Sequence, residues 1–191
     1  MFKSTLIGLA VAVAATAAQA TAEVRFAAHV ETVAIGQVFD LVLQGRSFDL
    51  SADGAPIGNV TGGQKLNVAY DPLSFELLSV SIDPRWTFAA GNREGVIDQA
   101  SGTLTGVAFG AFPATTDDNF DIATLTLRAL APGAGSLALV SGQFIGTVGG
   151  KAGQLITPSL GQAMVTVVPE PNQWALLLAG LGFVGLKLRR R

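Results

Sequence analysis

Apolar and polar residues alternate with a period of two through the middle of the chain, and no other pattern in the sequence limits the fold as strongly. In residues 64–70, for example, Leu66, Val68 and Tyr70 share one face, as expected of a strand with one side buried. Glycine, proline, asparagine and aspartate separate the alternating segments, and helical periodicity is almost absent. Strands are expected at residues 24–30, 37–44, 64–70, 75–82, 102–112, 120–129, 136–140, 143–148 and 162–168. Eight or nine short strands with glycine-rich turns predict an all-β fold, an antiparallel jelly-roll β-sandwich.

The first 22 residues have the pattern of a secretory signal peptide. Lys3 gives a basic start, an uncharged apolar run covers residues 6–18, and small residues follow at the positions that signal peptidase reads. Cleavage after Ala20 and cleavage after Ala22 fit this pattern equally well. An uncleaved N-terminal anchor is the alternative, but the apolar run is short and rich in alanine. We therefore expect residues 1–22 to form a signal helix that directs export and is then removed.

A second apolar segment stands near the other end of the chain, after a Pro-Glu-Pro sequence at residues 169–171. It begins at Trp174, which suits one membrane interface, and a basic cluster that suits the cytoplasmic side follows it. The cluster consists of Lys187, Arg189, Arg190 and Arg191. A helix from Trp174 to Leu188 is about 22 Å long, shorter than a hydrocarbon core of about 30 Å, so a buried amphipathic helix is an alternative. Because the segment is apolar on every side, a transmembrane helix is expected.

A Pro-Glu-Pro sequence, a short Leu/Gly-rich helix with an early Trp, and a terminal Arg cluster, in this order, resemble the PEP-CTERM sorting signal. The resemblance covers residues 168–191. It implies that a membrane exosortase recognises Pro169, Glu170 and Pro171 and cleaves the chain near them, in a Gram-negative bacterium that makes extracellular polysaccharide. The implied route is an inner-membrane intermediate, followed by the cell envelope, the cell surface or the extracellular matrix.

The order of local signals in residues 24–168 is similar to that of a cohesin domain. Gly36-Gln37 precedes the second strand, Tyr70-Asp71-Pro72 closes a core strand, and the Pro-Gly-Ala-Gly-Ser sequence at residues 132–136 supplies a later turn. The resemblance implies the jelly-roll sandwich that cohesins share with several carbohydrate-binding modules. Cohesins bind dockerins in cellulosomes, but no residue here matches a specific dockerin contact, so only the fold and the character of a binding module are implied. The expected domains are the signal peptide (1–22), the sandwich (23–168) and the sorting signal (169–191).

Composition argues against several classes of function. The chain has no cysteine, which removes thiol chemistry and thiolate metal sites. His29 is the only histidine, and no Gly-x-Ser-x-Gly sequence is present, so neither a Ser-His-Asp triad nor a zinc site is expected. The net charge of −2 excludes nucleic-acid binding that is driven by an overall positive charge. A glycosidase carboxylate pair stays open because no pair can be chosen without geometry, but an enzyme is not expected.

Two features of the central segment are candidates for ligand binding. Asp117, Asp118 and Asp121 supply the hard oxygen ligands that calcium prefers, but their spacing is not that of a twelve-residue calcium loop; a solvated turn is expected, and a calcium site is the alternative. Trp86 follows Asp83-Pro84-Arg85, where a turn exposes it for stacking on a sugar ring; a place in the core is the alternative. No cofactor is expected, and calcium at the three aspartates is the one alternative.

These observations predict an exported, non-catalytic binding or scaffold module. Signal peptidase and an exosortase are its expected processing partners, the C-terminal helix its contact with the membrane, and an envelope protein or a polysaccharide its ligand. A carbohydrate-binding module acting in polysaccharide binding or breakdown is the alternative, and it predicts glycan binding that is lost in Trp86→Ala. A glycan-active hydrolase is a third class, against which the absence of recognisable active-site residues counts.

Overall fold

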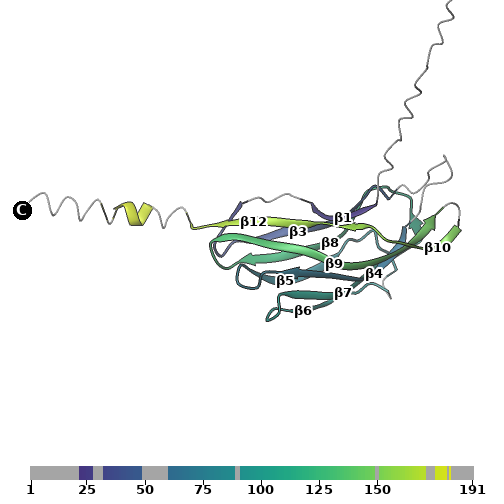
Figure 1. Ribbon diagram of the computed structural model, residues 1–191, viewed down its shortest axis with the longest axis horizontal. Helices are drawn as coiled ribbons and strands as arrows, with labels where there is room; N and C mark the ends of the chain where they lie inside the picture. Colours follow the sequence, from purple (N-terminus) through teal and green to yellow (C-terminus); the bar gives the residue numbers. More distant parts are fainter. Residues whose placement is uncertain are drawn as a thin grey trace, which may run out of the picture.

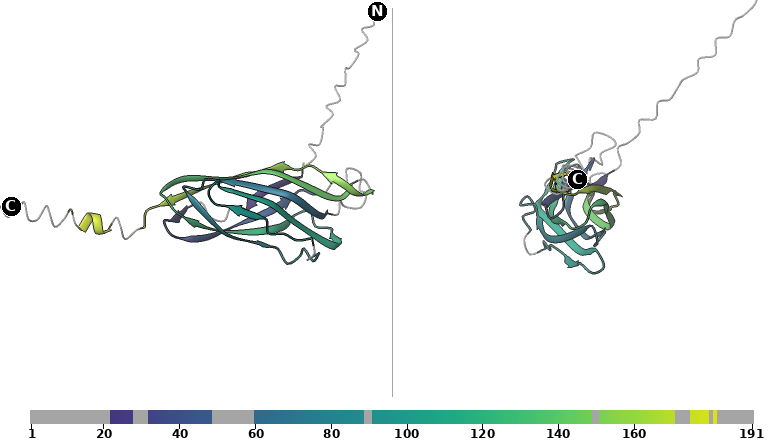
Figure 2. Two further views of the ribbon diagram at one scale, coloured as in Figure 1. Left: turned by 90° about the horizontal axis from the view of Figure 1, so that it is seen from below. Right: turned by 90° about the vertical axis from the view of Figure 1, so that its left-hand side faces the viewer.

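The computed structural model describes residues 22–27, 32–48, 60–88, 91–148, 151–170, 175–179 and 181. Two β-sheets pack face to face into an elongated sandwich (Figures 1 and 2). Sheet A has the strand order β11-β1-β3-β8-β5, and sheet B has the order β2-β12-β9-β4-β7-β6, with β10 paired to β9. The all-β sandwich that the alternation predicts is confirmed.

All strand pairs are antiparallel except β1 with β11 and β2 with β12, which are parallel. The strands of sheet A are β1 (Glu23–Ala27), β3 (Val38–Arg46), β5 (Phe75–Ile82), β8 (Phe120–Ala129) and β11 (Ser159–Leu160). The strands of sheet B are β2 (Thr32–Ala34), β4 (Val60–Tyr70), β6 (Val96–Asp98), β7 (Thr103–Thr115), β9 (Gly133–Val148), β10 (Lys151–Ile156) and β12 (Gln162–Val168).

The strand number differs from the prediction for two physical reasons. The segments 136–140 and 143–148 form the single strand β9, because the two residues between them keep the strand conformation and Ser141 pairs with Asn67 of β4. Four strands were missed: β2, β6 and β11 are too short to show a period, and β10 has five exposed residues in a row. The predicted signal helix and His29 lie outside the described residues.

The core lies between the sheets and follows the alternation. Leu66, Val68 and Tyr70 all point inward, as predicted, and are buried. At one end of the core the packing is aromatic: the rings of Phe48, Phe109, Phe120 and Phe144 contact one another in a chain with centroid distances of 4.9–5.6 Å. A continuous apolar interior of this kind stabilises a domain without disulfides.

Polar side chains on the outer face of sheet A contact one another across the strands. Arg128 of β8 forms an ion pair of 2.9 Å with Glu76 of β5. Beside this pair, the Thr126 hydroxyl donates a hydrogen bond of 2.7 Å to Asp40 of β3. These cross-strand contacts stabilise the pairing of β3, β5 and β8.

Gln99 covers the free edge of β5. Its Oε1 atom accepts hydrogen bonds from the Tyr70 hydroxyl (2.8 Å) and the Leu77 N–H (3.1 Å), and its Nε2 atom donates to the Phe75 carbonyl (2.8 Å). Burial, together with the nearby Asp98 and Glu76, raises the pKa of Tyr70, so its hydroxyl remains a donor. The amide of Gln99 thus replaces a neighbouring strand and protects the edge from pairing with another chain.

We expect Gln99→Ala to lower the free energy of unfolding by about 1–3 kcal/mol, because two backbone groups of β5 and one hydroxyl lose their partners together. Urea denaturation followed by circular dichroism measures this loss. Gln154→Ala is the matched control, since its side chain is exposed and contacts only the Ala152 carbonyl at 3.3 Å. Equal stability of the two variants would contradict the role of Gln99.

Asp71 fixes the turn between β4 and β5. Hydrogen bonds from the Ser74 hydroxyl (2.5 Å) and the Leu73 N–H (3.0 Å) hold the pKa of this carboxyl below its usual range. The unfolded chain therefore binds a proton at a higher pH than the folded chain does. The stabilisation is present above the unfolded pKa of about 3.9 and is lost as the pH falls through the lowered folded value.

We expect Asp71→Asn to be less stable than the native protein near neutral pH, with a difference that shrinks as the solution is acidified through the range in which Asp71 titrates. Urea unfolding at a series of pH values measures both proteins. A difference that does not change with pH would show that the charge of Asp71 contributes nothing.

Candidate functional site

Trp86 is buried, with only 2% of its surface exposed. Its ring joins the aromatic end of the core, at centroid distances of 4.6 Å from Phe109 and 5.3 Å from Phe120. The turn before it is present, and Asp83 stabilises this turn by accepting the Arg85 N–H at 2.9 Å, but the turn directs the ring inward. The prediction that the turn exposes Trp86 to a sugar is therefore wrong.

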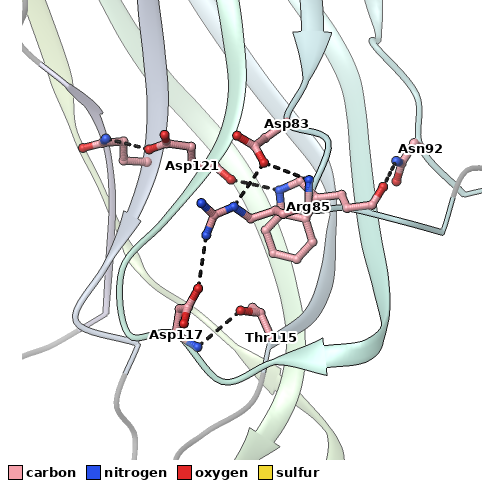
Figure 3. Close-up of polar contacts among 8 residues, drawn as sticks. Asp83, Arg85, Asn92, Thr115, Asp117 and Asp121 are labelled. Carbon is pink, nitrogen blue, oxygen red and sulfur yellow. Dashed lines mark hydrogen bonds and ion pairs between the residues drawn. The ribbon is translucent and has the colours of Figure 1, made fainter.

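Polar contacts tie the segment around Trp86 to Asp117 in the loop before β8 and to Asp121 in β8 (Figure 3). The indole Nε1–H donates to the Asp121 carbonyl at 2.9 Å, and Arg85 forms an ion pair of 3.3 Å with Asp117. Asn92 donates to the Trp86 carbonyl at 2.6 Å. Two candidate sites that lie apart in the sequence thus form one region, and its contacts fasten the β5–β6 connection to the end of the sandwich.

The three aspartates do not converge on a cation position. The Asp117 carboxylate is directed at Arg85, and the Asp121 carboxylate accepts a hydrogen bond of 2.6 Å from Gln44. The backbone carbonyl of Asp118 accepts the Phe48 N–H at 3.0 Å. In the part of the chain that the structure describes, no group of three or more His, Cys, Asp or Glu residues is placed to hold a metal ion. Asp117 and Asp118 thus lie in the loop before β8, and Asp121 lies in β8 itself.

The sorting segment begins where β12 ends. The Val168 carbonyl accepts the Ile35 N–H at 3.0 Å, Pro169 is half-buried, and Glu170 is exposed. Pro171, Trp174, Lys187, Arg189, Arg190 and Arg191 lie outside the described residues. Residues 175–179 and 181 are helical and exposed. The described residues include no helix that is long and apolar enough to cross a membrane.

An open groove of about 620 Å³ lies on the outer face of sheet B, in the middle of the sheet. It forms because β4 changes register against both β7 and β9 between Gly63 and Asn67. Side chains replace the interrupted ladder: Asn67 Oδ1 accepts the Gly106 N–H at 2.7 Å, and the Ser141 hydroxyl donates to the Lys65 carbonyl at 3.0 Å. Bulges of this kind redirect side chains and are frequent at functional sites.

Lys65 stands in this groove in a left-handed backbone conformation, with φ 54°. A residue with a Cβ atom adopts this conformation at a cost of about 1 kcal/mol or more. None of the ion pairs within the described residues involves Lys65, and the domain as a whole is acidic, because residues 23–168 contain 7 basic and 13 acidic side chains. The groove therefore presents one free cation between polar side chains and an apolar rim that includes Leu155 and Pro158.

Two aromatic side chains that are not part of the core lie close together near one end of sheet B. Phe88 is 56% exposed and Phe112 is 85% exposed. The Phe88 N–H donates to the Gly110 carbonyl at 2.9 Å, which holds Phe88 beside β7 two residues from Phe112. These are the aromatic rings that the described part of the chain offers to solvent, in place of Trp86.

Comparison with protein families confirms the predicted PEP-CTERM sorting motif at the end of the chain. Residues 167–191 match the family model of the PEP-CTERM protein-sorting motif. This motif indicates an exported protein that is sorted to the cell envelope. No curated protein sequence matches the chain.

Comparison with solved structures concerns the sandwich. A cohesin module from a family 33 glycoside hydrolase of Clostridium perfringens has a TM-score of 0.57 at 14% identity, covering 78% of this chain and 97% of that module. The sandwich has the cohesin fold. A type I cohesin–dockerin complex from Clostridium thermocellum is similar to the cohesin-like sandwich with a TM-score of 0.60 at 11% identity, over 78% of this chain and 100% of that one. A type I cohesin from Pseudobacteroides cellulosolvens matches with a TM-score of 0.57 at 15% identity, over 78% of this chain and 93% of that one.

Sequence reasoning missed the groove and Lys65. Gly62 and Gly63 inside a strand are a signal for a bulge, and they mark the place where the register of β4 shifts. The left-handed backbone conformation of Lys65 could not be predicted from the sequence, because lysine does not favour this conformation. The site was therefore detectable as an irregular strand but not as a groove.

Proposed function

We propose that this protein is an exported, non-catalytic binding module that an exosortase sorts to the cell envelope or the extracellular polysaccharide matrix of a Gram-negative bacterium, and that it binds a protein partner through the groove of sheet B. Signal peptidase would remove residues 1–22, the sandwich would occupy residues 23–168, and residues 169–191 would be the sorting signal. The observation that carries the proposal is the junction at Val168, where a PEP-CTERM motif continues directly from the last strand of a cohesin-like sandwich.

Three properties of the groove support it as the binding surface. It lies where the ladders of the central strand β4 are interrupted, and polar side chains such as Asn67, Ser141 and Gln143 line it. Its rim is apolar, which suits the buried centre of a protein interface. Lys65 gives it one free positive charge on an acidic domain, and such a charge selects a partner that carries a carboxylate. The similar cohesin from Clostridium thermocellum is itself solved in a complex with a dockerin.

A pull-down from the envelope fraction of the native host tests the proposal. We expect Lys65→Glu to weaken capture of the partner about tenfold or more, because it reverses the one free charge of the groove. The substitution leaves the fold intact, since glutamate meets the same backbone conformation as lysine. Arg128→Glu on sheet A is the control. Capture that is unaffected by Lys65→Glu, or equally affected by both variants, would contradict the groove as the binding surface.

Glycan binding is the second candidate, and the exposed pair Phe88 and Phe112 favours it, because an aromatic ring held at the surface can stack on a sugar. A glycan-binding assay separates the candidates. Glycan binding that is lost in a Phe88→Ala/Phe112→Ala variant and retained in Lys65→Glu would establish it. Protein capture that is lost in Lys65→Glu and retained in the Phe88→Ala/Phe112→Ala variant, with no glycan bound, would exclude glycan binding.

A further inference from the structure

The sandwich has one end from which the sorting segment leaves, and four turns gather there (Figures 1 and 2). Backbone hydrogen bonds join them: Gly36 N–H to the Ala129 carbonyl (2.8 Å), Leu130 N–H to the Ser74 carbonyl (2.8 Å), and Tyr70 N–H to the Gly102 carbonyl (2.8 Å). We call this the tail end. β12 reaches it at Val168, while β1 begins and β10 lies at the opposite end of the molecule (Figure 1).

Three large apolar side chains are exposed at the tail end. Leu73 is 79% exposed, Leu130 is 41% exposed and Val38 is 48% exposed. They are neighbours: the Leu130–Ser74 hydrogen bond places Leu130 beside Leu73, and Val38 pairs with Arg128, two residues from Leu130. We call these three side chains the apolar corner. They are not part of the buried core, and a group of exposed apolar side chains is typical of a contact surface.

The length of chain beyond β12 limits what can cover the apolar corner. Trp174 lies six residues beyond Val168, and a fully extended chain places the two at most about 22 Å apart. An apolar segment that enters a bilayer from Trp174 onward therefore holds the tail end within that distance of the lipid surface. The 16 residues of β9 keep the opposite end about 50 Å further away.

We propose that, as long as the sorting tail anchors the chain, the apolar corner rests in the interfacial region of the lipid bilayer, so that the sandwich stands end-on at the membrane. The inference rests on the proposed function, because it requires the tail to enter lipid. The carboxylates of Asp98 and Glu170 are exposed at the same end, which favours a zwitterionic surface over an anionic one. The contact holds residues 169–171 at the membrane surface, within reach of a membrane-embedded processing enzyme.

Site-specific fluorescence on the full chain tests this contact, and the absence of native cysteine allows single-cysteine labelling. Ala131→Cys places a probe next to Leu130 at the tail end, and Leu155→Cys places the control probe at the opposite end. The protein is reconstituted in phosphatidylcholine vesicles containing lipids with a nitroxide on the headgroup. We expect the probe at residue 131 to be quenched at least threefold more than the probe at residue 155, and less so when half of the lipid is phosphatidylglycerol.

A second variant keeps the test specific to the apolar corner. Leu73→Gln/Leu130→Gln leaves the tail unchanged, so the protein still floats with the vesicles, and we expect quenching at residue 131 to fall to the level at residue 155. Quenching that the double substitution does not change would overturn the proposal. Quenching that depends on protein concentration instead would show that a second copy covers the corner. Failure of the full chain to float with the vesicles would reject lipid anchoring itself, and the inference with it.

Discussion

Trp86→Ala is expected to lower the free energy of unfolding by about 3–5 kcal/mol, a large part of the stability of a domain of this size. The ring lies between Phe109 and Phe120, and its removal leaves a cavity among aromatic side chains that β-strands hold in place. The Asp121 carbonyl also loses the indole N–H that satisfies it. Urea denaturation measures the loss.

Phe112→Ala is the matched control for Trp86→Ala. It also removes an aromatic ring, but from a position that is 85% exposed, so we expect a change within about 0.5 kcal/mol. Trp86→Phe keeps most of the packing and loses only the N–H donor, so it should fall between the two. A Trp86→Ala variant as stable as Phe112→Ala would mean that the ring does not stabilise the core. Any glycan binding lost in Trp86→Ala has to be judged against this loss of fold.

Replacing the three residues Pro169, Glu170 and Pro171 with alanine is expected to abolish processing almost completely, because the sorting motif would lose the residues that define it. The fold is not expected to change, since β12 ends at Val168 and Glu170 is exposed. Intact-mass measurement on protein from the membrane and from the medium of the native host gives the readout. Native protein should end near residues 169–171, and the triple variant should keep residues 174–191 and stay in the membrane.

Two outcomes would contradict this prediction. Native protein that still carries residues 174–191 in the membrane would mean that the tail is a plain anchor. A triple variant that is processed as the native protein is would mean that another feature of the tail is read. Arg85→Ala, far from the tail, is the control for effects on export in general.

Features of the fold that depend on neighbouring residues could be predicted from the sequence, whereas features that depend on residues far apart in the chain could not. Leu66 and Val68 were assigned to the core because the alternation of a strand decides which face is buried, and that pattern is local. The direction of Trp86 was not predictable, because it depends on Asp121 in β8, 35 residues later in the chain. The three aspartates are close together in the sequence, but in the fold the Asp117 carboxylate contacts Arg85 and the Asp121 carboxylate contacts Gln44. The sorting motif was predictable because a processing enzyme reads it as a sequence.

The position of β12 has a consequence for the order in which the protein matures. This strand, the last of the chain, lies between β9 and β2 and is not added at an edge. A chain that is exported with its N-terminus first delivers residues 162–168 after every other strand. Until they arrive, sheet B has a gap beside β9, and β2 has no partner to hold it. In a chain exported in this direction, the sandwich would stay open until β12 arrives, so the arrival of the sorting signal would coincide with the completion of the fold.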